Sequence, residues 1–241
     1  MPPAAMTLAA LSRPSSLVES VSQQLARELR REGADEWLPA ERQLAEQLGV
    51  SRSVVREATK RLELQGLVEV RHGIGIRRAD RLHQPLNGSI AILIPDEPDR
   101  LRQSLEARLA IEPEVAKLAA HRASQSQLKD LQVVHATLTP DLALPEAAEA
   151  DILFHRTLAK ASGNEVFCLV LETLTDLGRA SRLATISHAG VERARRHHDQ
   201  VLQAVLKRDG TAAARAMRHH IERAQEDLQA RLESLRADSA K

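Results

Sequence analysis

The chain has 241 residues, of which 43% are hydrophobic and 28% are charged, with a formal net charge of +1. This composition excludes a wholly disordered chain, and the few aromatic residues exclude a stacking platform for single-stranded nucleic acid. The single cysteine, Cys168, excludes an internal disulfide framework and fits the cytoplasm, where we expect the protein to act. No apolar run approaches the roughly 18 residues of a membrane span, so we expect no membrane partner.

The spacing of hydrophobic residues near the N-terminus predicts a small helical domain over residues 15–78, after a flexible tail over residues 1–14. Hydrophobic spacing predicts one helix over 15–31, a short one over 42–47, and another that runs from Ser51 to Gly66. The period then changes, and residues 67–70 and 76–78 are predicted to form two short strands joined by a tight turn at 72–75.

Residues 79–98 show no useful helical period and contain Pro85, Asn87 and Gly88, which is typical of a linker. From Asp99 onward the pattern is helical, and Pro113 is expected to kink or split the first helix. Further helices are predicted over 124–138, 145–162, 164–185, 190–209 and 211–236, with Asn164 capping the helix over 164–185. The fold class is therefore mainly α, with an antiparallel helical bundle over 99–236.

Residues 40–65 have the parts of a helix–turn–helix, in which the second helix lies in the major groove of DNA. Arg52 and Arg56 are one turn apart, so both can reach base edges, while the hydroxyls of Ser51 and Ser53 suit phosphate. The surrounding segment carries more basic than acidic residues, and the following hairpin would form a wing. The alternative is a structural helical hairpin with exposed arginines.

The run LPAERQLAEQLGVSRSVVREATKRLELQGLVEVRHGIG closely resembles the winged-helix domain of GntR-family bacterial transcription regulators, and the resemblance covers residues 16–78. It implies that the operator contacts are made by Arg42, Ser51, Arg52, Ser53, Arg56, His72 and Gly73. One departure lies after Arg52, where the family often has Thr-Pro or Thr-Thr. Val54 cannot donate a hydrogen bond, so its contact with DNA would be apolar.

Four residues of the bundle could surround one divalent metal ion: Asp151, His155, His198 and His220. Asp151 and His155 are four apart and share a helix face. His198 and His220 fall on the apolar stripes of later helices. Imidazole suits several transition metals, so we expect Zn first, with Ni, Mn or Fe also compatible. The alternatives are ordinary core histidines and a local salt bridge between Asp151 and His155.

Helical periodicity also distinguishes His198 and His220, which face the core, from the histidines that precede them in the sequence. His197 and His219 fall on polar stripes and are predicted to point to solvent. Arg108 falls on the apolar stripe of the first bundle helix, where it could grip a carboxylate, although Glu112 one turn later could simply neutralise it. The sequence does not orient Arg179 or Arg182.

A second resemblance covers residues 99–230, which look like the FCD ligand-binding domain of the FadR branch of the GntR family. It rests on SLEARLAIEPEVAKLAAHRA, DILFHRTLAKASGN and HDQVLQAVLKRDGTAAARAMRHHI. In metal-binding members the ligands are the Asp and His of a D-x-x-x-H and two later His, which correspond to Asp151, His155, His198 and His220. The implied effector is a small carboxylate or sugar acid that lies against the metal.

The sequence therefore predicts a homodimeric, effector-controlled transcription regulator that binds a palindromic double-stranded DNA operator. Repression, relieved by the effector, is the expected sense of control, with activation as its alternative. Two other functions stay open. One is a hydrolase or lyase that uses the four metal ligands, and the other is a metal-free regulator that senses acyl-CoA.

Overall fold

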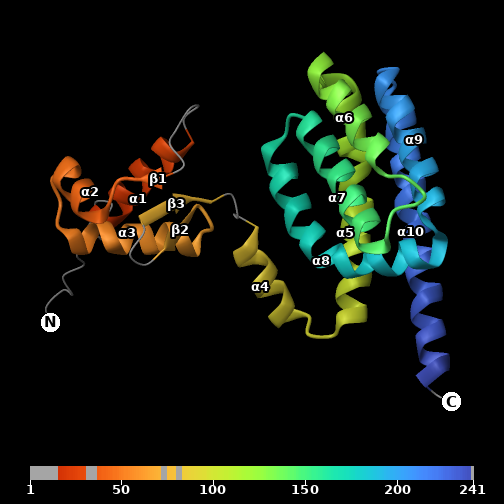
Figure 1. The fold of residues 1–241 in the computed structure, drawn as a ribbon, viewed down its shortest axis with the longest axis horizontal. Helices are drawn as coiled ribbons and strands as arrows, with labels where there is room; N and C mark the ends of the chain where they lie inside the picture. Colours follow the sequence, from red (N-terminus) through yellow and green to blue (C-terminus); the bar gives the residue numbers. More distant parts are fainter. Residues whose placement is uncertain (1–15, 31–36, 72–74, 80–82, 240–241) are drawn as a thin grey trace, which may run out of the picture. The chain divides into compact units, whose positions relative to one another are not determined.

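The computed structural model describes residues 16–30, 37–71, 75–79 and 83–239. The chain divides into two compact units, Met1–Pro85 and Leu86–Lys241, which are described separately (Figure 1). The tail predicted for residues 1–14 lies outside the described residues.

The first unit is built around three helices: α1 (Leu17–Leu29), α2 (Glu41–Leu48) and α3 (Arg52–Leu64). Ser16 caps α1 by accepting a hydrogen bond from Glu19 N at 3.1 Å. Gly49 ends α2 with a φ of 64°, a left-handed conformation that glycine adopts without strain. This sharp turn lets α3 begin three residues later, so the predicted helix–turn–helix is confirmed.

A three-stranded antiparallel sheet closes this unit, in the order β1-β3-β2. The predicted hairpin corresponds to β2 (Val68–Arg71) and β3 (Gly75–Arg78), which pair with Val70 opposite Ile76. The third strand, β1 (Trp37–Leu38), pairs with β3 and was not predicted. The core of the unit combines inward residues of all three helices with Val68 and Ile76 of the sheet.

The second unit opens with two helices that differ from the sequence expectations. Helix α4 (Gln84–Leu93) lies within the segment predicted to be a linker, and none of its residues is buried. Helix α5 (Glu97–Arg122) runs without a break through Pro113, so the expected split is wrong. Proline removes one hydrogen bond from a helix, and α5 accommodates this loss at Pro113, whose side chain is buried.

The remaining helices follow the predicted pattern closely: α6 (Gln125–Thr137), α7 (Leu144–Ala161), α8 (Glu165–Ala189), α9 (Val191–Leu206) and α10 (Gly210–Ser239). Asn164 caps α8 as predicted, because its Oδ1 accepts hydrogen bonds from Val166 N at 3.0 Å and Phe167 N at 3.2 Å. Helices α5, α7, α9 and α10 pack against one another around a core of small and aliphatic side chains (Figure 1). The mainly α fold class is confirmed.

Among the described residues, no helix has the length and the apolar character that crossing a membrane would require.

Candidate functional site

Three helices of the bundle bring the four predicted metal ligands into one buried cluster. Asp151 and His155 lie on α7, His198 on α9 and His220 on α10. Each side chain offers one ligand atom, and these atoms all lie within 4.8 Å of one another. All four residues are buried, with His198 fully enclosed. The structure thus places together the set that spacing and periodicity selected.

The contacts inside the cluster converge on a common point. His198 Nε2 lies 3.1 Å from Asp151 Oδ1, and His155 Nε2 lies 3.7 Å from Asp151 Oδ2. The Nε2 atoms of His155 and His220 face each other at 3.2 Å. Phe154 stacks on the His198 ring at a centroid distance of 4.2 Å and fixes its orientation. One carboxylate and three imidazoles therefore present their lone-pair positions to a shared space.

The hydrogen bonding of this cluster fits a metal ion. Among the described residues, His198 Nε2, the ring nitrogen that faces Asp151, is buried without a well-formed hydrogen bond. Buried polar atoms without partners are costly and call for an explanation such as an ion. The facing Nε2 atoms of His155 and His220 can share one hydrogen bond when one ring carries its proton there and the other does not, or both can direct lone pairs at a metal ion.

The protonation states of the cluster also suit a cation. Burial lowers the pKa of His155, and it lowers the pKa of His220 well below the ordinary value. Burial acts to raise the pKa of Asp151, but the neighbouring histidines and Arg182 hold it well below its usual range. Neutral histidines and an ionised carboxylate are the forms that coordinate metals.

A second layer of charge surrounds His155. Arg108 is buried and donates from Nε to Glu112 Oε1 at 2.5 Å, so the neutralising partner that the sequence offered is present. Glu112 Oε2 lies 2.6 Å from His155 Nδ1. Arg108 Nη2 lies 3.3 Å from His155 Nε2, on the side of the ligand atoms. Glu112 therefore holds both the arginine and one histidine of the cluster in place.

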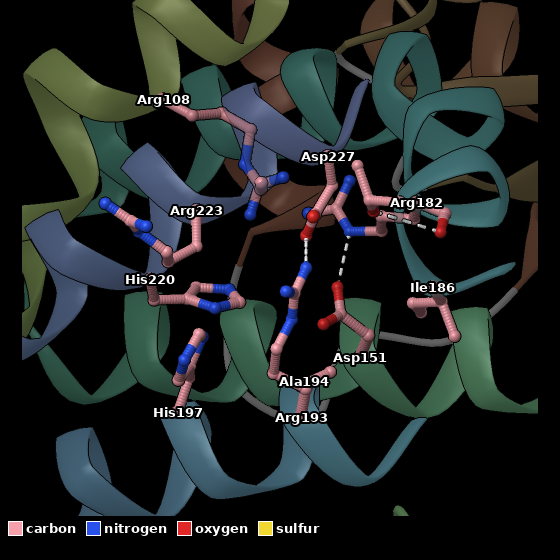
Figure 2. Close-up of a pocket in the computed structure, with 12 residues that line it drawn as sticks. Arg108, Asp151, Arg182, Ile186, Arg193, Ala194, His197, His220, Arg223 and Asp227 are labelled. Atoms are coloured by element: carbon pink, nitrogen blue, oxygen red, sulfur yellow. Dashed lines mark hydrogen bonds and ion pairs between the residues drawn. The ribbon is translucent and has the colours of Figure 1, made fainter. Parts of the chain in front are cut away.

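A cavity of about 30 Å³ adjoins the cluster, lined in part by Asp151, His220 and Arg108 (Figure 2). Arg182, which the sequence did not orient, donates from Nε to Asp151 Oδ2 at 2.7 Å, and its Nη1 is buried without a hydrogen bond to any described residue. Burial lowers the pKa of Arg182 to about 10, so it stays charged near neutral pH. The cavity is thus bordered by a guanidinium with an unused donor.

Two further arginines of the cavity wall were missed by the sequence analysis. Arg193 forms an ion pair with Asp227, and Arg223 pairs with Glu226 at 2.7 Å. Figure 2 shows the Arg193–Asp227 pair beside the Arg182–Asp151 pair. Their helices carry several other arginines, so spacing gave no signal that singled out these two.

One orientation predicted from periodicity is wrong. His197 does not point to solvent; it is half-buried and lines the cavity, with its ring 5.8 Å from that of His220. Burial and the nearby His219 lower the pKa of His197 to about 4. His219 is exposed, as predicted.

The candidate DNA-binding residues lie on the first unit. A groove of about 790 Å³ between α2, α3 and the sheet is lined by several cations, namely Arg42, Arg52, Arg56, Lys60 and Arg71. Ser51 caps α3 by accepting from Val54 N at 3.4 Å, and its hydroxyl lies 2.8 Å from that of Ser53. His72 and Gly73, the predicted wing tip, lie outside the described residues.

The fold and these sites define a class: a winged-helix DNA-binding unit joined to a helical ligand-binding unit. The chain belongs to the GntR family of bacterial regulatory proteins, whose model matches residues 17–77, and its residues 103–223 match the FCD domain.

Similar proteins have the same character. The chain is 34% identical over 195 residues to the putative L-lactate dehydrogenase operon regulatory protein of Escherichia coli K12, covering 76% of this chain and 74% of that one. It is 32% identical over 203 residues to the Glc operon transcriptional activator of the same organism, covering 79% and 80%. The solved structure of Streptococcus agalactiae GntR superposes with a TM-score of 0.72 at 26% identity, over 87% of this chain and 99% of that one.

The family and these relatives are transcription regulators. The chain is therefore a regulator of this kind, and the hydrolase or lyase alternative is wrong.

Proposed function

We propose that this protein is a homodimeric repressor whose binding to a palindromic operator is controlled by a small carboxylate or sugar-acid effector at a divalent metal. The observation that carries the proposal is the convergence of four buried ligand atoms within 4.8 Å, beside a cavity bordered by arginines. A metal-free regulator that senses acyl-CoA has no use for such a cluster. We propose that the protein acts in the cytoplasm.

In this proposal Asp151, His155, His198 and His220 hold the metal, with Zn expected first. A bound ion would supply a positive centre for an oxygen of the effector. Arg108 and Arg182 supply the complementary donors. Both are buried, and each already uses Nε on an acidic partner, so their Nη groups would meet the effector carboxylate; of these, Arg108 Nη2 also lies 3.3 Å from His155 Nε2.

The effector class follows from the donors and from one relative. Guanidinium groups beside a metal match a carboxylate whose neighbouring oxygen can reach the ion. The relative named for an L-lactate dehydrogenase operon is consistent with this chemistry, because L-lactate is a 2-hydroxy acid. The cavity of about 30 Å³ has room for roughly one or two water molecules. Effector binding therefore requires movement of the partly exposed Arg193 and Arg223 at its wall.

On the DNA side, Arg52 and Arg56 read base edges while Arg42, Ser51 and Ser53 meet phosphate, with His72 and Gly73 at the wing. Effector binding shifts the balance between a conformation that fits the operator and one that does not. The coupling expected for such control is about 1–3 kcal/mol, or roughly 5–150-fold in operator affinity. The relatives include both an activator and a repressor by name, so activation is the alternative sense.

Elemental analysis of purified variants tests the metal site. His198→Ala and His220→Ala should lose the metal and the response to hydroxy acids and sugar acids, because each removes a buried ligand. His219→Ala is the matched control, since His219 is exposed beside His220 on the same helix. Equal metal content in all three variants would refute the site.

Gel-shift titration tests the DNA side. Arg52→Ala and Arg56→Ala should each lose operator preference while the protein stays folded, because a bidentate contact with a base is worth about 1–3 kcal/mol of discrimination. Wild-type preference in either variant would refute its assignment.

A further inference from the structure

A carboxylate holds one of the arginines of the DNA-binding groove. Arg56 on α3 donates from Nε to Glu41 Oε1 and Oε2 at 3.4 and 3.2 Å, and from Nη2 to Glu41 Oε2 at 3.0 Å. Glu41 is the first residue of α2, fifteen positions earlier in the chain. The contact therefore joins the two helices of the helix–turn–helix through their side chains.

The geometry leaves Arg56 able to bind a second partner. Glu41 occupies the edge of the guanidinium formed by Nε and Nη2. The other edge, formed by Nη1 and the second N–H of Nη2, is the one that can donate two parallel bonds to an acceptor pair such as guanine O6 and N7. The side chain of Arg56 is 65% exposed, whereas that of Glu41 is only 25% exposed. Glu41 thus lies behind the arginine, and the arginine faces outward.

The position of Glu41 calls for an explanation, because a carboxylate in a groove that meets phosphate is repelled by DNA. The groove has one other acidic lining residue among the described residues, Glu63, whose Oε1 accepts from Val70 N at 3.0 Å. Glu63 thereby ties α3 to the sheet, which is a structural role. Glu41 makes its charged contacts with Arg56, so its effect on DNA binding acts through that side chain.

We propose that Glu41 is a positioning residue that sets the sequence preference of the protein by fixing Arg56 in its base-reading orientation. An arginine that is already held loses less conformational entropy when it binds a base. A free arginine can instead turn to a phosphate, where it carries no sequence information. This inference rests on the proposed contact between Arg56 and a base.

The test uses the full-length protein and two duplexes of equal length, one selected from a random pool by the wild-type protein and one of random sequence. The quantity measured is the ratio of the two affinities. Glu41→Ala should lower this ratio about tenfold, within the range of one base contact, while affinity for the random duplex stays equal or rises. Glu41→Gln keeps one acceptor for Arg56 and should keep more of the ratio than Glu41→Ala does.

Glu46→Ala is the matched control. Glu46 lies on the same helix and meets Arg42 at 3.5 Å, with both side chains well exposed. Its removal changes the charge equally, so a purely electrostatic effect would appear in both variants. The ratio should be unchanged in Glu46→Ala. Thermal unfolding of each variant separates a loss of folding, which would lower both affinities, from a loss of preference.

A double-mutant cycle decides whether Glu41 acts through Arg56. In the Arg56→Ala background, adding Glu41→Ala should lower the ratio no further. The inference is overturned if Glu41→Ala leaves the ratio at the wild-type value, or if it lowers the ratio equally with and without Arg56. Wild-type preference in Arg56→Ala alone would instead overturn the proposed base contact, and the inference with it.

Discussion

Removing the carboxylate of Glu112 should destabilise the helical bundle strongly. Glu112 is 2% exposed and lies between two buried groups, with Arg108 Nε at 2.5 Å and His155 Nδ1 at 2.6 Å. In Glu112→Ala the Arg108 guanidinium would remain buried without its partner. Breaking a buried ion pair by removing one member costs about 3–5 kcal/mol, mainly because the remaining charge is desolvated and unpaired.

The size of this effect can be converted into an observable. For a domain of about 150–250 residues, 1 kcal/mol shifts the melting temperature by roughly 2–4 °C, so Glu112→Ala should melt about 6–20 °C lower. Glu114→Ala is the matched control, because Glu114 lies on the same helix and pairs with Lys117 in a contact about half exposed. Such a surface pair is worth about 0–1 kcal/mol.

Two assays follow from the two contacts of Glu112. Denaturant unfolding of the metal-free protein measures the stability difference between Glu112→Ala and Glu114→Ala. Zinc titration of folded Glu112→Gln measures the effect on the site, and affinity should fall about 10–100-fold because Glu112 orients His155, one of the four proposed metal ligands. Equal stability of the two alanine variants would refute the reasoning about the buried pair, and unchanged zinc affinity would refute the positioning of His155.

Two further predictions concern pH and packing. The pKa of His220 is lowered in the folded protein, and that of His197 is lowered to about 4, so the unfolded chain binds more protons than the folded chain below about pH 6.5. The metal-free bundle should therefore lose stability as the pH falls from about 6.5 toward 4. A free energy of unfolding in urea that does not change over this pH range would contradict the prediction. In Gly210→Ala the new methyl group would meet the His121 ring, which is the far end of an exposed side chain and can turn away, so we expect a change of no more than about 0.5 kcal/mol. Gly88→Ala, with open space around the added Cβ, should be neutral or stabilising by up to about 1 kcal/mol in the same urea titration.

Much of the fold could be predicted because local chemistry fixes the helix boundaries. Asn164 is a side-chain cap in both the sequence pattern and the structure, and Ser51, where a helix was predicted to begin, caps α3. The strand β1 could not be predicted, because two residues carry no period and their strand character comes from pairing with β3. Helix α4 escaped for a related reason, since its exposed and largely apolar residues form no amphipathic stripe.

Some residues of the candidate site could likewise be predicted from the sequence, and others could not. His198 and His220 could be chosen because each shares an apolar stripe that the fold buries. Arg182 could not, because its role depends on Asp151, which lies 31 positions away on another helix. His197 was misplaced because a cavity interrupts the packing next to it, and periodicity distinguishes faces of a helix but does not reveal hollows.

Because the chain has few aromatic residues, tryptophan fluorescence reports on the DNA-binding unit alone. Trp37 is the single tryptophan and there is no tyrosine, so intrinsic fluorescence excited selectively in indole originates from one strand of the sheet. The ring is 39% exposed and lies about 3.5 Å from where a Cβ would stand on Gly75. The bundle contributes no such emission. If an effector that binds in the bundle alters this fluorescence without DNA present, a conformational change has passed from the bundle to the other unit. The change can be measured in the unmodified protein, without an added fluorescent label.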